Sequence, residues 1–264
     1  MALAFPGFED LSRKGGDRPR WGEQVEGVRA VEHLLKAGRR EIKHLYLVKG
    51  AAGVVKSLAG LAGEVGVRPT EVDKGRIRQM AMTSVPQGVI AVCEPLPAVS
   101  VSDLARKAAK ERGYLIAFDG VEDPANMGAA LRTASALGAV GALIPEHGGA
   151  GLTPSAVKSA AGAVEYLDLA PVKSLAKALA QTSDAGLWSV ILDSGGRSIY
   201  DQPLLTEPLV LVVGGEGRGV SRLVAERADL IASIPLSGKV ESLNASAAVA
   251  AACSEICRIR GERA

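Results

Sequence analysis

The sequence predicts an α/β protein with two domains, the second of which is built on a mainly parallel sheet. Short apolar runs typical of buried strands alternate with amphipathic helical segments along most of the chain. The segment 93–99 interrupts this alternation with two prolines, which indicates a semi-rigid linker. The length of 264 residues is compatible with two domains, given roughly 150 residues per domain.

The N-terminal part begins with a polar arm and continues as a small α/β domain. Residues 1–22 are rich in Gly, Arg and Pro and are interpreted as a flexible basic arm. Residues 23–92 are assigned to the first domain and residues 93–110 to the linker. The apolar spacing predicts a helix ending at Gly38, a strand at 42–48, a helix at 54–61, a strand at 65–67, a helix at 72–80 and a strand at 88–92.

Residues 111–264 are assigned to the second domain, in which apolar runs again alternate with helical segments. Strands are expected at 115–118, 140–144, 188–192, 209–213 and 230–234. Helices are expected at 126–137, 154–163, 173–181, 219–227 and 243–260. Ligands bind such sheets in the loops beyond the carboxyl ends of the strands, so these loops are the candidate site.

Composition and spacing exclude several classes of protein. No apolar run approaches the ~18 residues of a membrane span, and the N-terminus lacks the pattern of a secretory signal, so we expect a cytoplasmic protein. The three histidines and three cysteines lack the spacing of metal ligands, so no metal is expected, and the cysteines are interpreted as small buried side chains. Lys and Arg outnumber Asp and Glu in the first 100 residues, an excess that could supply contacts to RNA phosphates, although charge alone does not establish such a partner.

The loop after the strand at 115–118 leads into a helix of small apolar residues. Asn126 lies near the start of that helix, where capping is an ordinary role for asparagine. Arg132 lies nearly two turns further along and is the only charged residue of this helix. An arginine on a surface built for close packing is a candidate functional residue.

The loop after the strand at 209–213 is rich in glycine and contains Glu216. It departs from the dinucleotide fingerprint, which requires a glycine where this loop has Val220 or Arg222. It also departs from the Walker A motif, because Val220 stands in place of the lysine. Glycines allow a ligand to approach the backbone closely. Because both phosphate-binding motifs are missing, a nucleoside without a diphosphate fits this loop better than NAD or ATP.

The loop after the strand at 230–234 runs into an alanine-rich helix. Ser242 and Asn244 stand just before that helix, and each is either an N-cap or a site residue. The sequence leaves both interpretations open.

Together the three loops resemble the three motifs of the SpoU/TrmH family of RNA 2′-O-ribose methyltransferases, which belong to the SPOUT superfamily. The matching segments are Gly-Val-Glu-Asp-Pro-Ala-Asn-Met-Gly-Ala-Ala-Leu-Arg-Thr-Ala, Leu-Val-Leu-Val-Val-Gly-Gly-Glu-Gly-Arg-Gly and Ile-Pro-Leu-Ser-Gly-Lys-Val-Glu-Ser-Leu-Asn-Ala-Ser. Segments 25–35 and 86–91 are similar to the L30e-like substrate-binding domain of the RlmB-type branch, which methylates guanosine in 23S rRNA. The resemblance implies an N-terminal L30e-like domain, a C-terminal SPOUT domain with a trefoil knot, and a homodimer.

The implied reaction is methyl transfer from S-adenosylmethionine to a ribose 2′-hydroxyl of RNA, with 23S rRNA as the favoured partner. Arg132 would clamp an RNA phosphate and acidify the hydroxyl, because arginine is a poor base; direct proton abstraction stays open. Asn126 would orient Arg132 or the substrate, Glu216 would join the network around the ribose, and Ser242 and Asn244 would hold the third loop. The residues implied for cofactor binding are Gly214, Gly215, Gly219, Ile234, Leu236, Leu243, Asn244 and Ser246.

Three alternatives are weighed against this interpretation. The first keeps the enzyme and changes the RNA to transfer RNA or to a resistance-type ribosomal site. The second is an RNA-binding protein without catalysis, which the presence of Arg132, Glu216 and Asn244 disfavours. The third is an NAD-dependent oxidoreductase, which the departure from the dinucleotide fingerprint disfavours.

Overall fold

The computed structural model describes residues 20–239 and 242–261. These divide into two compact units: the first runs up to Pro97 and includes Leu152–Tyr166, and the second comprises Ala98–Gly151 and the chain from Leu167 onward. Residues 1–19, which make up most of the expected arm, lie outside the described residues. No helix among the described residues is long and apolar enough to cross a membrane.

The first unit is built on a four-stranded mixed sheet in the order β1-β4-β2-β3. Strands β1 (Gln24–Glu26) and β2 (Ile42–Val48) pair antiparallel with β4 (Val89–Cys93), and β3 (Thr70–Val72) is parallel to β2. Its helices are α2 (Val28–Ala37), α3 (Gly53–Glu64) and α4 (Lys74–Met80). The strand expected at 65–67 is wrong, because Gly66 has a φ of 78° and this stretch terminates α3 through backbone hydrogen bonds.

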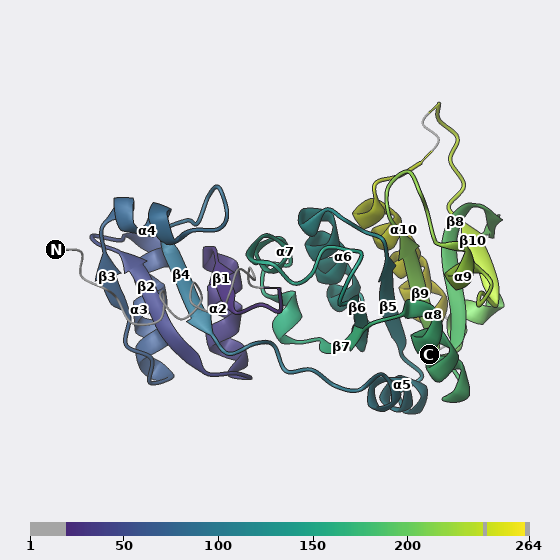
Figure 1. The fold of residues 1–264 in the computed structure, drawn as a ribbon, viewed down its shortest axis with the longest axis horizontal. Helices are drawn as coiled ribbons and strands as arrows, with labels where there is room; N and C mark the ends of the chain where they lie inside the picture. The colour runs from purple at the N-terminus through teal and green to yellow at the C-terminus, as the bar shows by residue number, and fades with distance from the viewer. Residues whose placement is uncertain (1–19, 240–241, 262–264) are drawn as a thin grey trace. The chain divides into compact units, whose positions relative to one another are not determined.

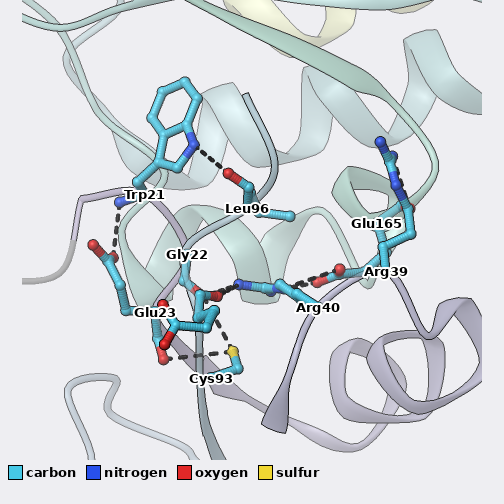
Figure 2. Close-up of polar contacts among 9 residues, drawn as sticks. Trp21, Gly22, Glu23, Arg39, Arg40, Cys93, Leu96 and Glu165 are labelled. Atoms are coloured by element: carbon cyan, nitrogen blue, oxygen red, sulfur yellow. Dashed lines mark hydrogen bonds and ion pairs between the residues drawn. The ribbon is translucent and has the colours of Figure 1, made fainter. Parts of the chain in front are cut away.

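The expected arm ends earlier than the sequence predicts, because Trp21 and Gly22 are held in the first unit. The indole nitrogen of Trp21 donates a hydrogen bond to the carbonyl of Leu96 at 2.8 Å (Figure 2). The backbone nitrogen of Gly22 donates to the carbonyl of Leu152 at 2.9 Å. A large aromatic side chain is ordered here by contacts distant in sequence, which composition cannot reveal.

The segment Leu152–Tyr166 contains α7 (Pro154–Ser159) and the short helix η1 (Ala163–Glu165), where the sequence predicts one helix. Positive φ angles at Ala161 and Gly162 separate the two. The segment is fastened by an ion pair between Arg40 and Glu165, whose side chains are 2% and 1% exposed (Figure 2). Arg40 also donates to the carbonyl of Gly22 at 2.7 Å, so this buried pair has additional hydrogen-bonding partners.

The second unit is built on a six-stranded sheet in the order β10-β8-β9-β5-β6-β7, and every pair is parallel. The prediction of an α/β fold with a mainly parallel sheet is therefore confirmed. The strands are β5 (Tyr114–Asp119), β6 (Gly141–Pro145), β7 (Asp168–Val172), β8 (Trp188–Ser198), β9 (Leu209–Gly214) and β10 (Leu230–Ser233).

Helices cover both faces of this sheet. One face packs against α5 (Val101–Lys110), α8 (Leu175–Asp184) and α9 (Arg222–Ala225) in a continuous apolar core. On the other face, α6 (Pro124–Ala136) and the C-terminal helix α10 (Ala245–Gly261) lie side by side (Figure 1). Alternate residues of the buried strands point to opposite faces, which is why these strands read as continuous apolar runs.

Two elements of the second unit differ from the sequence prediction. Residues 101–110, assigned to the linker, form α5; Ser100 caps it, and Leu104, Ala105 and Ala108 are buried against the sheet. Strand β7 was not predicted, because its run is short and contains Pro171; it is an edge strand, where proline is tolerated.

The C-terminal helix is anchored by polar groups near its end. Arg258 donates to Glu255 at 2.8 Å, and Glu255 also accepts the backbone nitrogen of Asp201 at 2.9 Å. Hydrogen bonding from Arg258 lowers the pKa of Glu255 from its ordinary value of 4.5 and outweighs the opposing effect of burial.

The interpretation of all three cysteines as buried is wrong for Cys257, which is exposed on this helix.

We expect Glu255→Gln to lower the free energy of unfolding by about 1–3 kcal/mol near neutral pH, because charged hydrogen bonds are lost. A lowered pKa in the folded state gives stability that is present above pH 4.5 and is lost as the pH falls through the folded-state pKa. The gap between the variant and the wild type should therefore close in acid. Thermal unfolding at a series of pH values measures it, with the exposed Glu226→Gln as the control. An equal gap at all pH values would contradict the assignment.

Candidate active site

The candidate site lies where β5, β9 and β10 end in the second unit, as expected for a parallel sheet. Asn126 comes from the first turn of α6, Glu216 from the loop after β9, and Asn244 from the residue before α10. The side-chain amide of Asn126 donates to the carboxylate of Glu216 at 2.6 Å. The amide of Asn244 donates to Asn126 at 2.9 Å and to Glu216 at 3.2 Å. The three loops are thus joined by one hydrogen-bond network.

Local sequence explains how Asn126 is available for this network. Asp123, not Asn126, caps α6 by accepting the backbone nitrogen of Ala125 at 2.9 Å, and Pro124 occupies the first turn. Because the cap is supplied upstream, the amide of Asn126 is used for contacts between loops.

Asn244 fulfils both interpretations that the sequence left open. Its side-chain oxygen accepts the backbone nitrogen and the hydroxyl of Ser246, each at 2.8 Å, as an N-cap does. Its side-chain nitrogen faces Asn126 and Glu216. One residue therefore begins α10 and orients the network.

The glycine-rich loop needs its glycines at positions of close backbone approach. A Cβ at Gly215 would lie 2.0 Å from the carbonyl oxygen of Gly120, and a Cβ at Gly214 would lie 2.3 Å from the carbonyl carbon of Gly219. Gly217 and Gly219 have positive φ angles of 79° and 62°. The loop therefore presents mainly backbone, which is compatible with a ligand held by backbone groups.

Two carboxylates that the sequence analysis missed also lie at this edge of the sheet. Asp119, the last residue of β5, accepts the backbone nitrogen of Ser221 at 2.6 Å and so fastens the far end of the glycine-rich loop. Asp193 follows the apolar half of β8, and its carboxylate would be 3.4 Å from a Cβ at Gly219. Asp119 and Asp193 directly follow the apolar runs 115–118 and 188–192, and that position was the signal that could have revealed them.

The other candidate residues stand apart from the network. Arg132 is exposed on α6, and Ser242 is exposed in the third loop; neither makes a side-chain hydrogen bond or ion pair within residues 20–239 and 242–261. Leu236 and Leu243 are unusually exposed for leucines, at 41% and 40%. Ile234 is half-buried just after β10.

No cluster of three or more His, Cys, Asp or Glu residues suited to a metal ion occurs in the described part of the chain.

Asn126→Asp tests the charge balance of the network. The change places a second carboxylate beside Glu216, and two carboxylates in contact raise the pKa of one of them. We expect the methyl transfer that the motif resemblance implies to fall, and to fall further as the pH rises, because both groups are then charged and repel each other. Rates measured from about pH 6 to about pH 9 test this expectation. Asn126→Ala, which adds no charge, should lack the additional loss at high pH; identical profiles would contradict the expectation.

The chain was compared with known proteins. A model of the SpoU rRNA Methylase family matches residues 113–254. The chain belongs to this family. A second model, described as RNA 2′-O ribose methyltransferase substrate binding, matches residues 24–99. Membership makes the chain an RNA 2′-O-methyltransferase that uses S-adenosylmethionine.

Relatives match both units of the chain. The 23S rRNA (guanosine-2′-O-)-methyltransferase RlmB of Pseudomonas syringae pv. tomato is 35% identical over 247 residues, covering 91% of this chain and 97% of the relative. The structure of the SpoU methyltransferase AviRb from Streptomyces viridochromogenes with AdoMet has a TM-score of 0.78 and 27% identity, covering 97% of this chain and 98% of that one. The A. aeolicus TrmH/SpoU tRNA modifying enzyme has a TM-score of 0.51 and 26% identity, covering 62% of this chain and 83% of that one.

Proposed function

We propose that this SpoU methyltransferase transfers a methyl group from S-adenosylmethionine to the 2′-hydroxyl of a guanosine in 23S rRNA. The observation that carries the proposal is the network of Asn126, Glu216 and Asn244, which joins the three family motifs at one edge of the sheet. The RlmB relative, whose named activity this is, aligns with nearly the whole chain. Because ribosomal RNA is the proposed substrate, we place the protein in the cytoplasm.

The second and third loops are proposed to hold the cofactor. The glycine-rich loop presents backbone where side chains would collide, and two exposed leucines of the third loop could be covered by an adenine ring. When bound, S-adenosylmethionine supplies a methyl group already activated on a sulfonium, so the protein needs mainly to orient the reactants. The residues proposed to contact it are Gly214, Gly215, Gly219, Ile234, Leu236, Leu243, Asn244 and Ser246.

The proposed role of Arg132 is to bind an RNA phosphate and to favour loss of the ribose hydroxyl proton. Its guanidinium is exposed and is not committed to another described side chain, so it is available to an anionic ligand. The network around Glu216 would accept hydrogen bonds from the ribose and present a negative charge where the cofactor is positive. Ser242 is proposed to contact the ribose from the third loop.

Ribosomal RNA is favoured over transfer RNA by the presence of the first unit. Residues 24–99 match a substrate-binding model, whereas the tRNA-modifying relative covers 62% of this chain. We propose that the first unit, with an L30e-like fold over about residues 23–92, binds the RNA. If deletion of the first unit left the affinity for every RNA substrate unchanged, this assignment would be contradicted.

The assembly is proposed to be a homodimer in which each site receives groups from both subunits. The proposal is supported by Arg132, which is exposed and has no hydrogen bond to the network among the described residues, so it is accessible to a partner subunit. We also propose that the segment between β10 and α10 threads a trefoil knot, a rare topology. A monomer in sedimentation at the concentration of the activity assay would contradict the proposed homodimer. An experimental structure without a knot would contradict the proposed trefoil knot.

Methyl incorporation tests the function. The full-length protein is incubated with radiolabelled S-adenosylmethionine and with unmodified 23S rRNA, 16S rRNA or tRNA, and the labelled RNA is digested to nucleosides. The expected product is 2′-O-methylguanosine in 23S rRNA. Label on a base, or in tRNA alone, would overturn the proposal. Ribosomal particles assembled without this methylation are included as substrates, so that a need for a folded RNA does not appear as inactivity.

A further inference from the structure

We propose that Tyr166 and His33 form a stacking site for an unpaired base of the RNA substrate. This proposal rests on the proposed function. Tyr166 is 53% exposed, more than any other Tyr, Trp or Phe side chain in the described part of the chain. It follows η1 and belongs to the first unit, although it lies within the range that matches the methylase family model. Stacking on aromatic rings is a general way in which proteins bind unpaired bases.

The ring of Tyr166 is held in a defined position. Its hydroxyl is 3.0 Å from Nδ1 of His33, and the two rings meet edge to face with centroids 5.5 Å apart. His33 in turn lies against Gly162, where a Cβ would come within 2.3 Å of the histidine Cβ. Gly162 also has a φ of 91°, so both the close approach of His33 and the backbone conformation require glycine at this position.

The backbone that carries Tyr166 is fixed by the buried ion pair of its neighbour. Glu165 accepts hydrogen bonds from Arg40, and its carbonyl accepts Nη1 of Arg39 at 3.2 Å (Figure 2). An exposed aromatic ring on such a braced turn loses little conformational entropy when it binds a ligand. A ring whose role was packing in the core would be buried, whereas this ring is exposed and fixed in position.

The charges beside this ring favour an anionic partner. Helix α2 contributes Arg29 and Lys36, which share one acidic partner, Glu32. Arg39, which is exposed, donates to the carbonyl of Glu165, and the Glu165 carboxylate is paired with Arg40. Arg29, Lys36 and Arg39 thus place cationic groups on the segment that carries His33, and cations beside an aromatic ring suit the phosphates and a base of single-stranded RNA. Residues 24–99, which supply these cations, match the substrate-binding family model.

The test measures RNA affinity of full-length variants by fluorescence anisotropy, with a labelled single-stranded RNA of about 12 nucleotides, a length within the usual site size. We expect Tyr166→Ala and Tyr166→Leu to weaken binding about five- to a hundredfold, the usual effect of losing one stacked base. Tyr166→Phe keeps the ring and loses only the hydroxyl contact with His33, so it should retain most of the affinity. Tyr200→Ala is the matched control, because Tyr200 is 47% exposed in the second unit.

Salt dependence separates stacking from a loss of charge. The slope of log affinity against log salt should be unchanged in Tyr166→Ala, whereas Arg39→Gln should reduce it by about one phosphate contact. Unfolding temperature and S-adenosylmethionine binding of each variant check the fold, and Tyr166→Leu retains apolar bulk if the alanine variant is unstable.

Equal RNA affinity of Tyr166→Ala and the wild type would overturn the stacking site, as would equal losses in Tyr166→Phe and Tyr166→Ala. A wild type that methylates RNA, with an unchanged KM in Tyr166→Ala, would overturn this site and leave the proposed function standing. RNA binding that depends on Tyr166, in a protein that methylates no RNA, would overturn the proposed function and leave the stacking site standing.

Discussion

Arg132→Ala is expected to reduce the rate of RNA methylation by about 10²–10⁴-fold, the range for losing a group that assists proton transfer or stabilises charge. S-adenosylmethionine binding should be unchanged, because the glycine-rich and third loops proposed to hold the cofactor do not contain this residue. The side chain is exposed and has no hydrogen bond or ion pair among the described residues, so the fold should also be retained. Single-turnover methyl transfer and calorimetric cofactor titration measure the two effects separately.

The matched control is Arg106→Ala, which removes an exposed arginine from another helix of the same unit. Arg132→Lys distinguishes the two roles that were left open. A lysine keeps the positive charge, so a phosphate clamp should retain part of the rate. Wild-type activity in Arg132→Ala would remove this residue from the active site.

Gly215→Ala is expected to abolish cofactor binding and to lower the unfolding temperature by several degrees. The added Cβ would lie 2.0 Å from the carbonyl oxygen of Gly120, and backbone cannot rotate away as a flexible side chain can. Overpacking of this kind costs about 1–3 kcal/mol or more, and it would push the glycine-rich loop away from the end of β5. Calorimetric binding of S-adenosylmethionine and thermal unfolding provide the measurements.

Gly217→Ala is the matched control in the same loop. A Cβ there meets nothing within 4 Å, so only the positive φ of 79° opposes the change, at a cost of about 1–2 kcal/mol. Cofactor affinity should therefore be largely retained in Gly217→Ala and lost in Gly215→Ala. Equal behaviour of the two variants would show that the close approach of Gly215 to Gly120 is unimportant.

Strands with strong apolar runs were predicted well, because their signal is local. The run at 42–48 is β2 at the same bounds, and the run at 209–213 is β9 with one residue added. Strand β8 was predicted only to 192, because its second half is polar and is a strand through pairing of Arg197 and Ser198 with β10. The helix expected at 219–227 is reduced to α9, because the loop before it keeps positive φ angles up to Gly219.

The sequence by itself determined the residue types at the carboxyl ends of β5, β9 and β10, and through them the family and its chemistry. Only the tertiary structure decided which of these side chains meet. Asn126 bonds Glu216 across 90 residues and Asn244 across 118, and local periodicity contains no information on such pairs. The structure alone also showed that Leu152–Tyr166 joins the first unit. The buried Arg40–Glu165 pair fastens that segment, and neither residue could bear burial without a partner 125 residues away.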